Sequence, residues 1–254
     1  MENLKKVLTK LKYLGCSGIK ISYEDEGALL NEIITMRYLT AYVGVNLSIK
    51  IGGCEAKRDI VDCVNLNSDT IVAPMVESPF ALKKFANSLK AYNYDGEKGF
   101  NLETIQAYKS LEEISEDFHL VDFVTFGRVD FVTSLNKDRT YVNSEEMFDI
   151  ASNIFQKARE HDIKCYLGGA ISIESRTFIE KLILKNLIDN FETRYVIFDT
   201  SKIDIEKLPE LLYLANVFEV EWLKLISNRY NLLFNKDINR IKMIEDRLNM
   251  NNSN

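Results

Sequence analysis

Short apolar runs rich in β-branched residues recur along the chain, and each is followed by a segment with the periodicity of an amphipathic helix. Between the runs, segments such as "GALLNEIITMRYLTAY" and "SEEMFDIASNIFQKAREH" place apolar residues at helical spacing. The pattern predicts strands that alternate with helices. Seven runs are predicted to be strands, at residues 18–22, 46–53, 70–76, 99–104, 123–130, 165–172 and 195–199.

A repeating strand–helix unit in a chain of 254 residues has two main solutions, an open doubly wound sheet and a closed (β/α)₈ barrel. The dinucleotide fingerprint Gly-x-Gly-x-x-Gly is absent after the first strand, and so is a Walker Gly-x-x-x-x-Gly-Lys loop. We therefore predict an α/β fold with the architecture of a (β/α)₈ TIM barrel. Because the pattern marks seven strands, either the eighth is weak in sequence or the barrel is irregular.

Beyond the last predicted strand, the chain continues with a long stretch of helical periodicity. We predict a TIM-barrel catalytic domain at residues 1–205 and C-terminal helices at 206–250, which pack on the barrel or on a neighbouring subunit. The Asn-rich residues 251–254 are predicted to form a disordered tail.

The composition narrows the function classes. A net charge of -6 and a pI near 5.2 argue against a nucleic-acid surface, which normally needs a Lys/Arg-rich face. No run approaches the length of apolar residues that crosses a bilayer, and the amino-terminal "MENLKK" lacks the apolar segment of a signal peptide. We therefore expect a cytoplasmic protein. The four cysteines are scattered without a Cys-x-x-Cys pair, so neither a zinc site nor a disulfide framework is expected.

The ends of the predicted strands are rich in charged residues. In this fold the active site lies at the carboxyl ends of the strands. Acidic side chains at several of these ends predict a mouth that attracts a cation. The charged strand-end residues are Glu24, Asp25, Glu26, Glu77, Glu103, Arg128, Asp130 and Asp199.

Side-chain alternation along a strand indicates which residues face the barrel interior. In "LSIKI" the apolar residues share one face, so Lys50 points inward, and in "FNLE" the same argument turns Asn101 and Glu103 inward. By the same rule Arg128 and Asp130 share a face. Two carboxylates on neighbouring strand ends suit Mg²⁺ or Mn²⁺, which prefer oxygen ligands. Acidic strand ends also arise from salt bridges and helix N-caps, and this alternative stays open.

Three segments carry a resemblance to a known family. "APMVESPFALKKF", "NLETIQAYKSLEEI" and "VDFVTFGRVDFVTSL" occur in the order and spacing of the HpcH/HpaI aldolase and citrate lyase β-subunit family. The resemblance covers roughly residues 45–170. It implies a (β/α)₈ barrel that uses a divalent metal to make or break a carbon–carbon bond next to a 2-oxo acid or an acyl-CoA thioester.

The resemblance also implies roles for individual residues. Glu103 and Asp130 match the metal-binding Glu and Asp of the family, so Mg²⁺ or Mn²⁺ is the expected cofactor. A metal chelated by a 2-oxo acid would stabilise the enolate that forms when the bond breaks. Backbone N–H groups around Gly127 would hold the substrate carboxylate. Glu77 and Lys20 complete the predicted substrate-binding residues.

The sequence departs from the family pattern at two points that bear on chemistry. Lys50 stands at or near the position where relatives usually have an Arg, and Arg128 is a candidate to compensate. We therefore predict Lys50 and Arg128 as catalytic residues. The aldolase branch uses a His as acid and base, whereas His119 and His161 of this chain precede strands and belong to the other end of a barrel.

Three interpretations remain. The first is a metal-dependent lyase or aldolase whose partners are small-molecule substrates, either 2-oxo acids or acyl-CoA thioesters. The second is a Schiff-base aldolase that uses Lys50 as its amine, with Lys20 as a neighbouring cation. The third is a diverged barrel of the same family that binds a metal or a ligand without turnover. Lys50 has a purely structural reading too, as the partner of Glu24 or Glu77 in an ion pair. A homo-oligomer is expected, because relatives commonly assemble through their C-terminal helices.

Overall fold

The computed structural model describes residues 1–251, except for the side chains of Leu233, Asp237 and residues 245–251. Of the predicted tail, residues 252–254 lie outside the described part of the chain.

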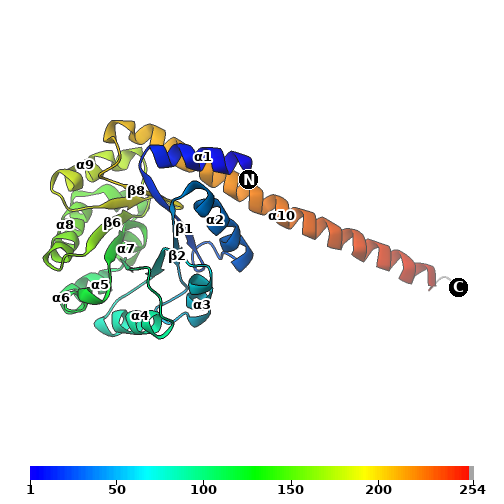
Figure 1. The fold of residues 1–254 in the computed structure, drawn as a ribbon, viewed down its shortest axis with the longest axis horizontal. Coiled ribbons are helices and arrows are strands. Elements are labelled where there is room, and N and C mark those ends of the chain that lie inside the picture. Colours follow the sequence, from blue (N-terminus) through cyan, green and yellow to red (C-terminus); the bar gives the residue numbers. More distant parts are fainter. Residues whose placement is uncertain (252–254) are drawn as a thin grey trace.

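Eight strands close into a barrel in sequence order (Figure 1). The first seven strands run parallel, whereas the last runs antiparallel to both of its neighbours. The predicted α/β barrel is therefore confirmed, and it is irregular. The strands are β1 (Cys16–Ser22), β2 (Asn46–Lys50), β3 (Thr70–Ala73), β4 (Glu97–Leu102), β5 (Phe123–Gly127), β6 (Lys164–Gly168), β7 (Asn190–Glu192) and β8 (Val196–Asp199).

The strand that the sequence pattern does not reveal is β7. It has 3 residues, which is too short for an alternation pattern to stand out. Residues 193–195 then reverse the chain directly into β8, without an intervening helix. As a result Asp199 pairs with Asn190, the first residue of β7, and lies at the amino end of the parallel strands. The prediction that Asp199 belongs to the acidic mouth is wrong, because it assumed that every strand runs the same way.

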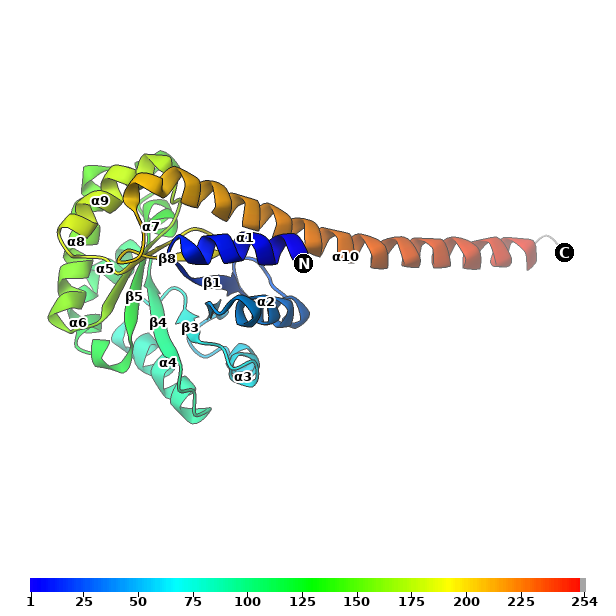
Figure 2. The ribbon, with the colours of Figure 1, turned by 45° about the horizontal axis from the view of Figure 1, so that its top comes forward.

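Helices between the strands form the outer layer around the barrel (Figures 1 and 2). Most of them bury one apolar face against the strands, as amphipathic periodicity predicts. The α-helices are α1 (Glu2–Tyr13), α2 (Leu30–Val43), α3 (Lys57–Asn65), α4 (Pro79–Ala91), α5 (Ile105–Lys109), α6 (Leu111–Ser115), α7 (Arg128–Ser134), α8 (Glu145–Glu160), α9 (Arg176–Leu184) and α10 (Leu208–Asn251). Short 3₁₀ helices are η1 (Phe118–Leu120), η2 (Arg139–Asn143), η3 (Ile173–Ser175) and η4 (Ile205–Lys207).

The floor of the barrel is filled by a small apolar cluster. Phe123 stacks on Tyr166 with ring centroids 4.2 Å apart, and Val72 and Ile197 pack beside them. Gly99 leaves the room for this stack, because a Cβ there would lie 2.0 Å from the ring of Phe123. The filled floor closes the amino end of the barrel, so the inward polar side chains meet at the carboxyl end.

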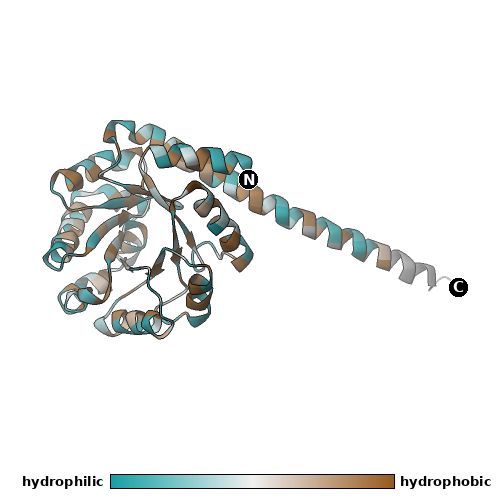
Figure 3. Ribbon diagram, viewed as in Figure 1, coloured by the Kyte–Doolittle hydropathy of each residue, from teal (hydrophilic) through white to brown (hydrophobic). Residues whose placement is uncertain are grey.

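The predicted C-terminal helices are one helix, α10, of 44 residues. Its first turns are held by buried Leu211, Phe218 and Trp222 and pack against α1. Its remainder projects from the barrel, and up to residue 244 polar and apolar residues alternate along it (Figure 3). No helix within residues 1–251 joins the length and the apolarity that a bilayer span requires.

Candidate active site

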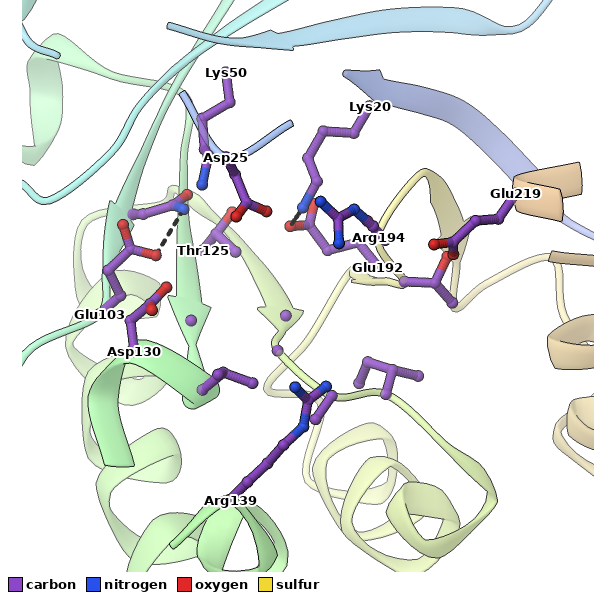
Figure 4. A pocket seen from close by; sticks show the side chains of 18 of the residues that line it. Lys20, Asp25, Lys50, Glu103, Thr125, Asp130, Arg139, Glu192, Arg194 and Glu219 are labelled. Carbon is purple, nitrogen blue, oxygen red and sulfur yellow. Dashed lines mark hydrogen bonds and ion pairs between the residues drawn. The ribbon is translucent and has the colours of Figure 1, made fainter. Parts of the chain in front are cut away.

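A cavity of about 410 Å³ opens at the carboxyl ends of the parallel strands (Figure 4). Its walls come from the barrel strands, from the loop after β1 and from α10. Five carboxylates and four cations line it, which leaves a net charge of −1. The charged lining residues are Asp25, Glu103, Asp130, Glu192, Glu219, Lys20, Lys50, Arg139 and Arg194.

Glu103 follows β4 directly and points into the cavity, as alternation predicts. Its side chain is buried and doubly held. Oε1 accepts a hydrogen bond from the backbone N–H of Met75 at 3.0 Å, and Oε2 accepts one from Nδ2 of Asn101 at 3.0 Å. Met75 adopts a φ of 51°, a left-handed conformation that is costly for a residue with a Cβ. The Pro-Met element of the sequence therefore aims an N–H at Glu103.

Asp130 lies beside Glu103 at the start of α7, and the two side chains share one side of the cavity (Figure 4). Within the described part of the chain, its carboxylate makes no hydrogen bond or ion pair. Burial raises the pKa of Glu103, with Lys50 opposing the shift and Asp130 adding to it. Burial also raises the pKa of Asp130, and Lys50 again opposes the shift. The structure thus brings the two predicted metal ligands together, and burial disfavours the charged form of both carboxylates.

Gly127 ends β5 and lines the cavity against Glu103. A Cβ at this position would lie 2.6 Å from Oε2 and 2.8 Å from Cβ of Glu103. The glycine therefore lets Glu103 reach the place that it occupies. That its N–H binds a substrate carboxylate stays a prediction.

Lys50 ends β2 and lines the cavity. Its Nζ lies 3.0 Å from Oε2 of Glu24, which is the ion pair of the structural reading. Burial favours the neutral amine, but Glu103, Glu24 and Asp25 outweigh it and raise the pKa of Lys50. A Schiff-base mechanism needs a neutral amine, so this environment speaks against that interpretation. Lys20 also lines the cavity, where it pairs with Glu192.

Arg128 is fully buried and lies outside the cavity lining. Its guanidinium donates to backbone oxygens of Gly168, Gly169 and Val142 and to Oδ1 of Asn143. The sequence pattern predicts strand at residues 128–130, whereas α7 begins at Arg128. In a helix successive residues turn by about 100°, so residues two apart point in nearly opposite directions. The geometry therefore favours a positioning role for Arg128 instead of the predicted catalytic one.

Glu77, predicted to bind substrate, is exposed and lies outside the cavity lining. Its Oε1 accepts a hydrogen bond from Oγ1 of Thr104 at 2.6 Å, and Thr104 in turn accepts one from Ala107 as the N-cap of α5. Glu77 therefore helps to hold the N-cap of α5. This role corresponds to the helix N-cap alternative that the sequence analysis left open for acidic strand ends. His119 and His161 also lie outside the cavity lining.

Several lining residues are not predicted from the sequence. Glu192 and Arg194 belong to the short β7 and its turn, which no pattern marks. Arg139 reaches the mouth from η2 (Figure 4), and Glu219 comes from α10 far along the chain. The polar–apolar–polar order of "NFE" in β7 agrees with an inward Glu192, but three residues are too few to identify a strand.

Comparison with known proteins identifies the family. A family model described as HpcH/HpaI aldolase/citrate lyase matches residues 34–177. A search of curated proteins finds no match.

Among solved structures, an HpcH/HpaI aldolase from Desulfitobacterium hafniense superposes with a TM-score of 0.62 at 12% identity, over 87% of this chain and 88% of that one. An HpcH/HpaI aldolase/citrate lyase family protein from Burkholderia cenocepacia has a TM-score of 0.58 at 11% identity, over 70% and 80%. The citrate synthase SbnG has a TM-score of 0.59 at 11% identity, over 81% and 84%. These likenesses show the fold. Because the family model spans more than half of the sequence, the chain belongs to the HpcH/HpaI aldolase/citrate lyase family of lyase-type enzymes.

Proposed function

We propose that this protein is a metal-dependent carbon–carbon lyase that acts on a 2-oxo acid or an acyl-CoA thioester through an enolate. The observation that carries the proposal is the pair Glu103 and Asp130, side by side in a charged cavity at the carboxyl end of the barrel (Figure 4). Lyase chemistry is the activity of the family, and its members generally use a divalent metal.

The residues of this chain fit such a metal. The carboxylate of Asp130 has no hydrogen-bond or ion-pair partner within the described residues, and each oxygen of Glu103 accepts one hydrogen bond and keeps a lone pair. The described residues contain no group of three or more His, Cys, Asp or Glu side chains placed to hold a metal. Two carboxylates suffice for Mg²⁺ or Mn²⁺, which retain water or substrate oxygens in other positions. Glu103 and Asp130 would hold the ion, and when bound it supplies a Lewis acid for the substrate carbonyl.

The charges of the cavity support an anionic substrate. A divalent cation changes the net charge of the lining from −1 to +1, which favours the binding of a carboxylate. Lys50 stays protonated beside Glu103 and can balance negative charge that develops on the substrate oxygen. Asn101 and the N–H of Met75 hold Glu103 in place while this happens. The apolar cluster around Phe123 and Tyr166 limits the entry of water from the amino end of the barrel.

Proton transfer in this cavity falls to a carboxylate, because no histidine of the described chain lines it. The lining carboxylates besides Glu103 and Asp130 are Asp25, Glu192 and Glu219, and Figure 4 shows Asp25 nearer to Glu103 and Asp130 than the other two, with Glu219 on the far side. Glu192 is already engaged with Lys20, which leaves Asp25 as the better placed base.

The test is enolate formation from pyruvate, and from acetyl-CoA in a parallel sample. Incubation with Mg²⁺ in D₂O is expected to exchange the methyl protons of one of the two, which proton NMR follows directly. Removal of the metal with EDTA should stop the exchange. If the protein binds Mg²⁺ and oxalate in calorimetry but exchanges neither substrate, the diverged binding barrel is the correct interpretation and the lyase proposal is wrong.

Gly127→Ala is expected to weaken the binding of Mg²⁺ by roughly tenfold or more, because the new Cβ pushes Glu103 away from Asp130. The same overlap should lower the free energy of unfolding by about 1–3 kcal/mol. Calorimetry with Mg²⁺ and urea denaturation measure the two effects. The matched control is Gly52→Ala, whose Cβ would meet only Oδ2 of Asp59 at 3.2 Å. Equal Mg²⁺ affinity in the two variants would contradict the packing argument.

The predicted homo-oligomer stays a prediction. Exposed apolar side chains along the projecting part of α10 support it, since an amphipathic helix usually buries such residues. The exposed residues are Leu232, Phe234, Ile238, Ile241 and Ile244.

A further inference from the structure

Arg194 lies on the turn between β7 and β8, at the place where this barrel departs from regular βα alternation. The turn is held by backbone hydrogen bonds from Thr193 to Val196 at 2.9 Å and from Lys20 to Tyr195 at 2.7 Å. Oγ1 of Thr193 also accepts a hydrogen bond from the N–H of Val196 at 3.1 Å. A helix at this point would carry the chain away from the mouth, whereas the tight turn keeps Arg194 at the mouth.

Arg194 lies between two cavities. It lines the candidate active site, and it also lines a second cavity of about 230 Å³ bounded by α2 and α10. Its Nε lies 3.3 Å from Oε1 of Glu26, which lines the second cavity but not the first. Glu26 therefore contacts the guanidinium at Nε, and Figure 4 shows the guanidinium end of Arg194 directed toward Lys20 and Glu192 in the active-site cavity.

Three cations of the cavity each pair with one carboxylate: Lys50 with Glu24, Lys20 with Glu192 and Arg194 with Glu26. Arg194 differs from the two lysines because its guanidinium keeps further N–H donors besides the Nε that faces Glu26. Figure 4 shows Arg194 across the cavity from Glu103 and Asp130. A substrate carboxylate that reaches away from this pair meets Arg194 on the opposite wall.

Glu26 is unusual among the carboxylates of the protein. Its side chain is 7% exposed, and Oε2 is buried without a hydrogen-bond partner among the described residues. Burial raises the pKa of Glu26 to about 7, although Lys20, Arg194 and Lys50 oppose the shift. The charged and titratable groups around Glu26 and its ion pair are Lys20, Lys50, Asp25, Arg194, Tyr195, Glu32, Glu219 and Tyr230.

We propose that Arg194 binds the carboxylate of the substrate and that Glu26 is the residue that positions Arg194 for it. This inference rests on the proposed lyase function, since it concerns the same cavity. An arginine suits the task because its fork can bind both oxygens of a carboxylate, which an ammonium group cannot do.

The ion pair should respond to pH in a defined direction. Glu26 is ionised above its pKa of about 7 and neutral below it, so the ion pair with Arg194 is complete in mild alkali and weakens as the pH falls. The binding of a carboxylate ligand should weaken in the same direction between pH 8 and pH 6. The carboxylates of oxalate are fully ionised in this range and add no titration of their own.

Calorimetric titration of the Mg²⁺-loaded protein with oxalate tests the proposal. We expect Arg194→Gln to raise the Kd for oxalate by about 10- to 100-fold, with partial rescue in Arg194→Lys. Glu26→Gln is expected to raise the Kd by about three- to tenfold at pH 8 and to remove its dependence on pH. The affinity for Mg²⁺ alone should stay unchanged in all three variants.

The outcomes separate the two proposals. If the wild-type protein binds oxalate and Arg194→Gln binds it equally well, the inference is overturned while the lyase proposal stands. The inference is also overturned if Arg139→Gln, at the rim of the mouth, causes the loss and Arg194→Gln does not. If the wild-type protein binds neither Mg²⁺ nor oxalate, both proposals fail.

Discussion

Glu103→Gln and Asp130→Asn are each expected to weaken Mg²⁺ binding by on the order of 100-fold, because each removes one of two negatively charged oxygen ligands. The exchange of substrate protons should fall by on the order of 1,000-fold, since a Lewis acid contributes several kcal/mol to the stabilisation of an enolate. Both substitutions preserve the shape of the side chain. Glu103 keeps its acceptor oxygen for Met75 or Asn101, so the fold should remain intact.

Calorimetry with Mg²⁺ and the NMR exchange assay measure these two effects, with circular dichroism as a check of folding. Glu77→Gln is the matched control, because it makes the same chemical change at an exposed residue outside the cavity. Unchanged Mg²⁺ affinity in both cavity variants would place the metal elsewhere. A similar loss in Glu77→Gln would show that the assay reports general carboxylate loss and not the site.

Arg128→Met is expected to lower the free energy of unfolding by about 3–5 kcal/mol, because it leaves several buried carbonyl oxygens without a donor. The guanidinium links β6 and the residues after it to the segment at η2 through Gly168, Gly169, Val142 and Asn143. Burial lowers the pKa of Arg128 to about 9, so the side chain is still charged at neutral pH and its donors stay in place.

Urea denaturation at neutral pH measures the effect as a shift of the unfolding midpoint. Arg139→Met is the matched control, because that arginine is exposed and makes no hydrogen bond or ion pair within the described residues. Its stability should stay within about 0.5 kcal/mol of the wild-type value. If Arg128→Met unfolds at the wild-type urea concentration but loses all proton exchange, the catalytic role predicted from the sequence is correct.

The sequence pattern was sufficient for the barrel because its signals are local. Runs such as "LSIKI" and "FNLE" indicate both a strand and the face of it that points inward. Alternation alone therefore predicts that Lys50 and Glu103 point into the barrel, where both line the cavity. Asp130 was predicted from its place at a strand end and from alternation, and the family motif then assigned it to the metal. Asp130 does reach the cavity, but from the first turn of α7 and not from a strand.

The failures have one physical cause, which is that strand direction and helix onset depend on contacts far along the chain. Whether residues 128–130 continue β5 or begin α7 decides if Arg128 faces the cavity or the protein interior. The direction of β8 depends on its antiparallel pairing with β1 and β7. Because of this pairing, Asp199 lies at the amino end of the parallel strands and not at the mouth of the active site.

The amino-acid sequence by itself determined the fold class, the family and the two carboxylates of the candidate metal site, because periodicity and short motifs are properties of neighbouring residues. Tertiary structure alone decided that Arg194 and Glu219 meet these carboxylates across the cavity, and that Glu26 contacts Arg194. These residues come from the turn after β7, from α10 and from the loop after β1. Only the closure of the barrel brings segments so far apart in the sequence together, and no pattern among neighbouring residues predicts that they are close in space.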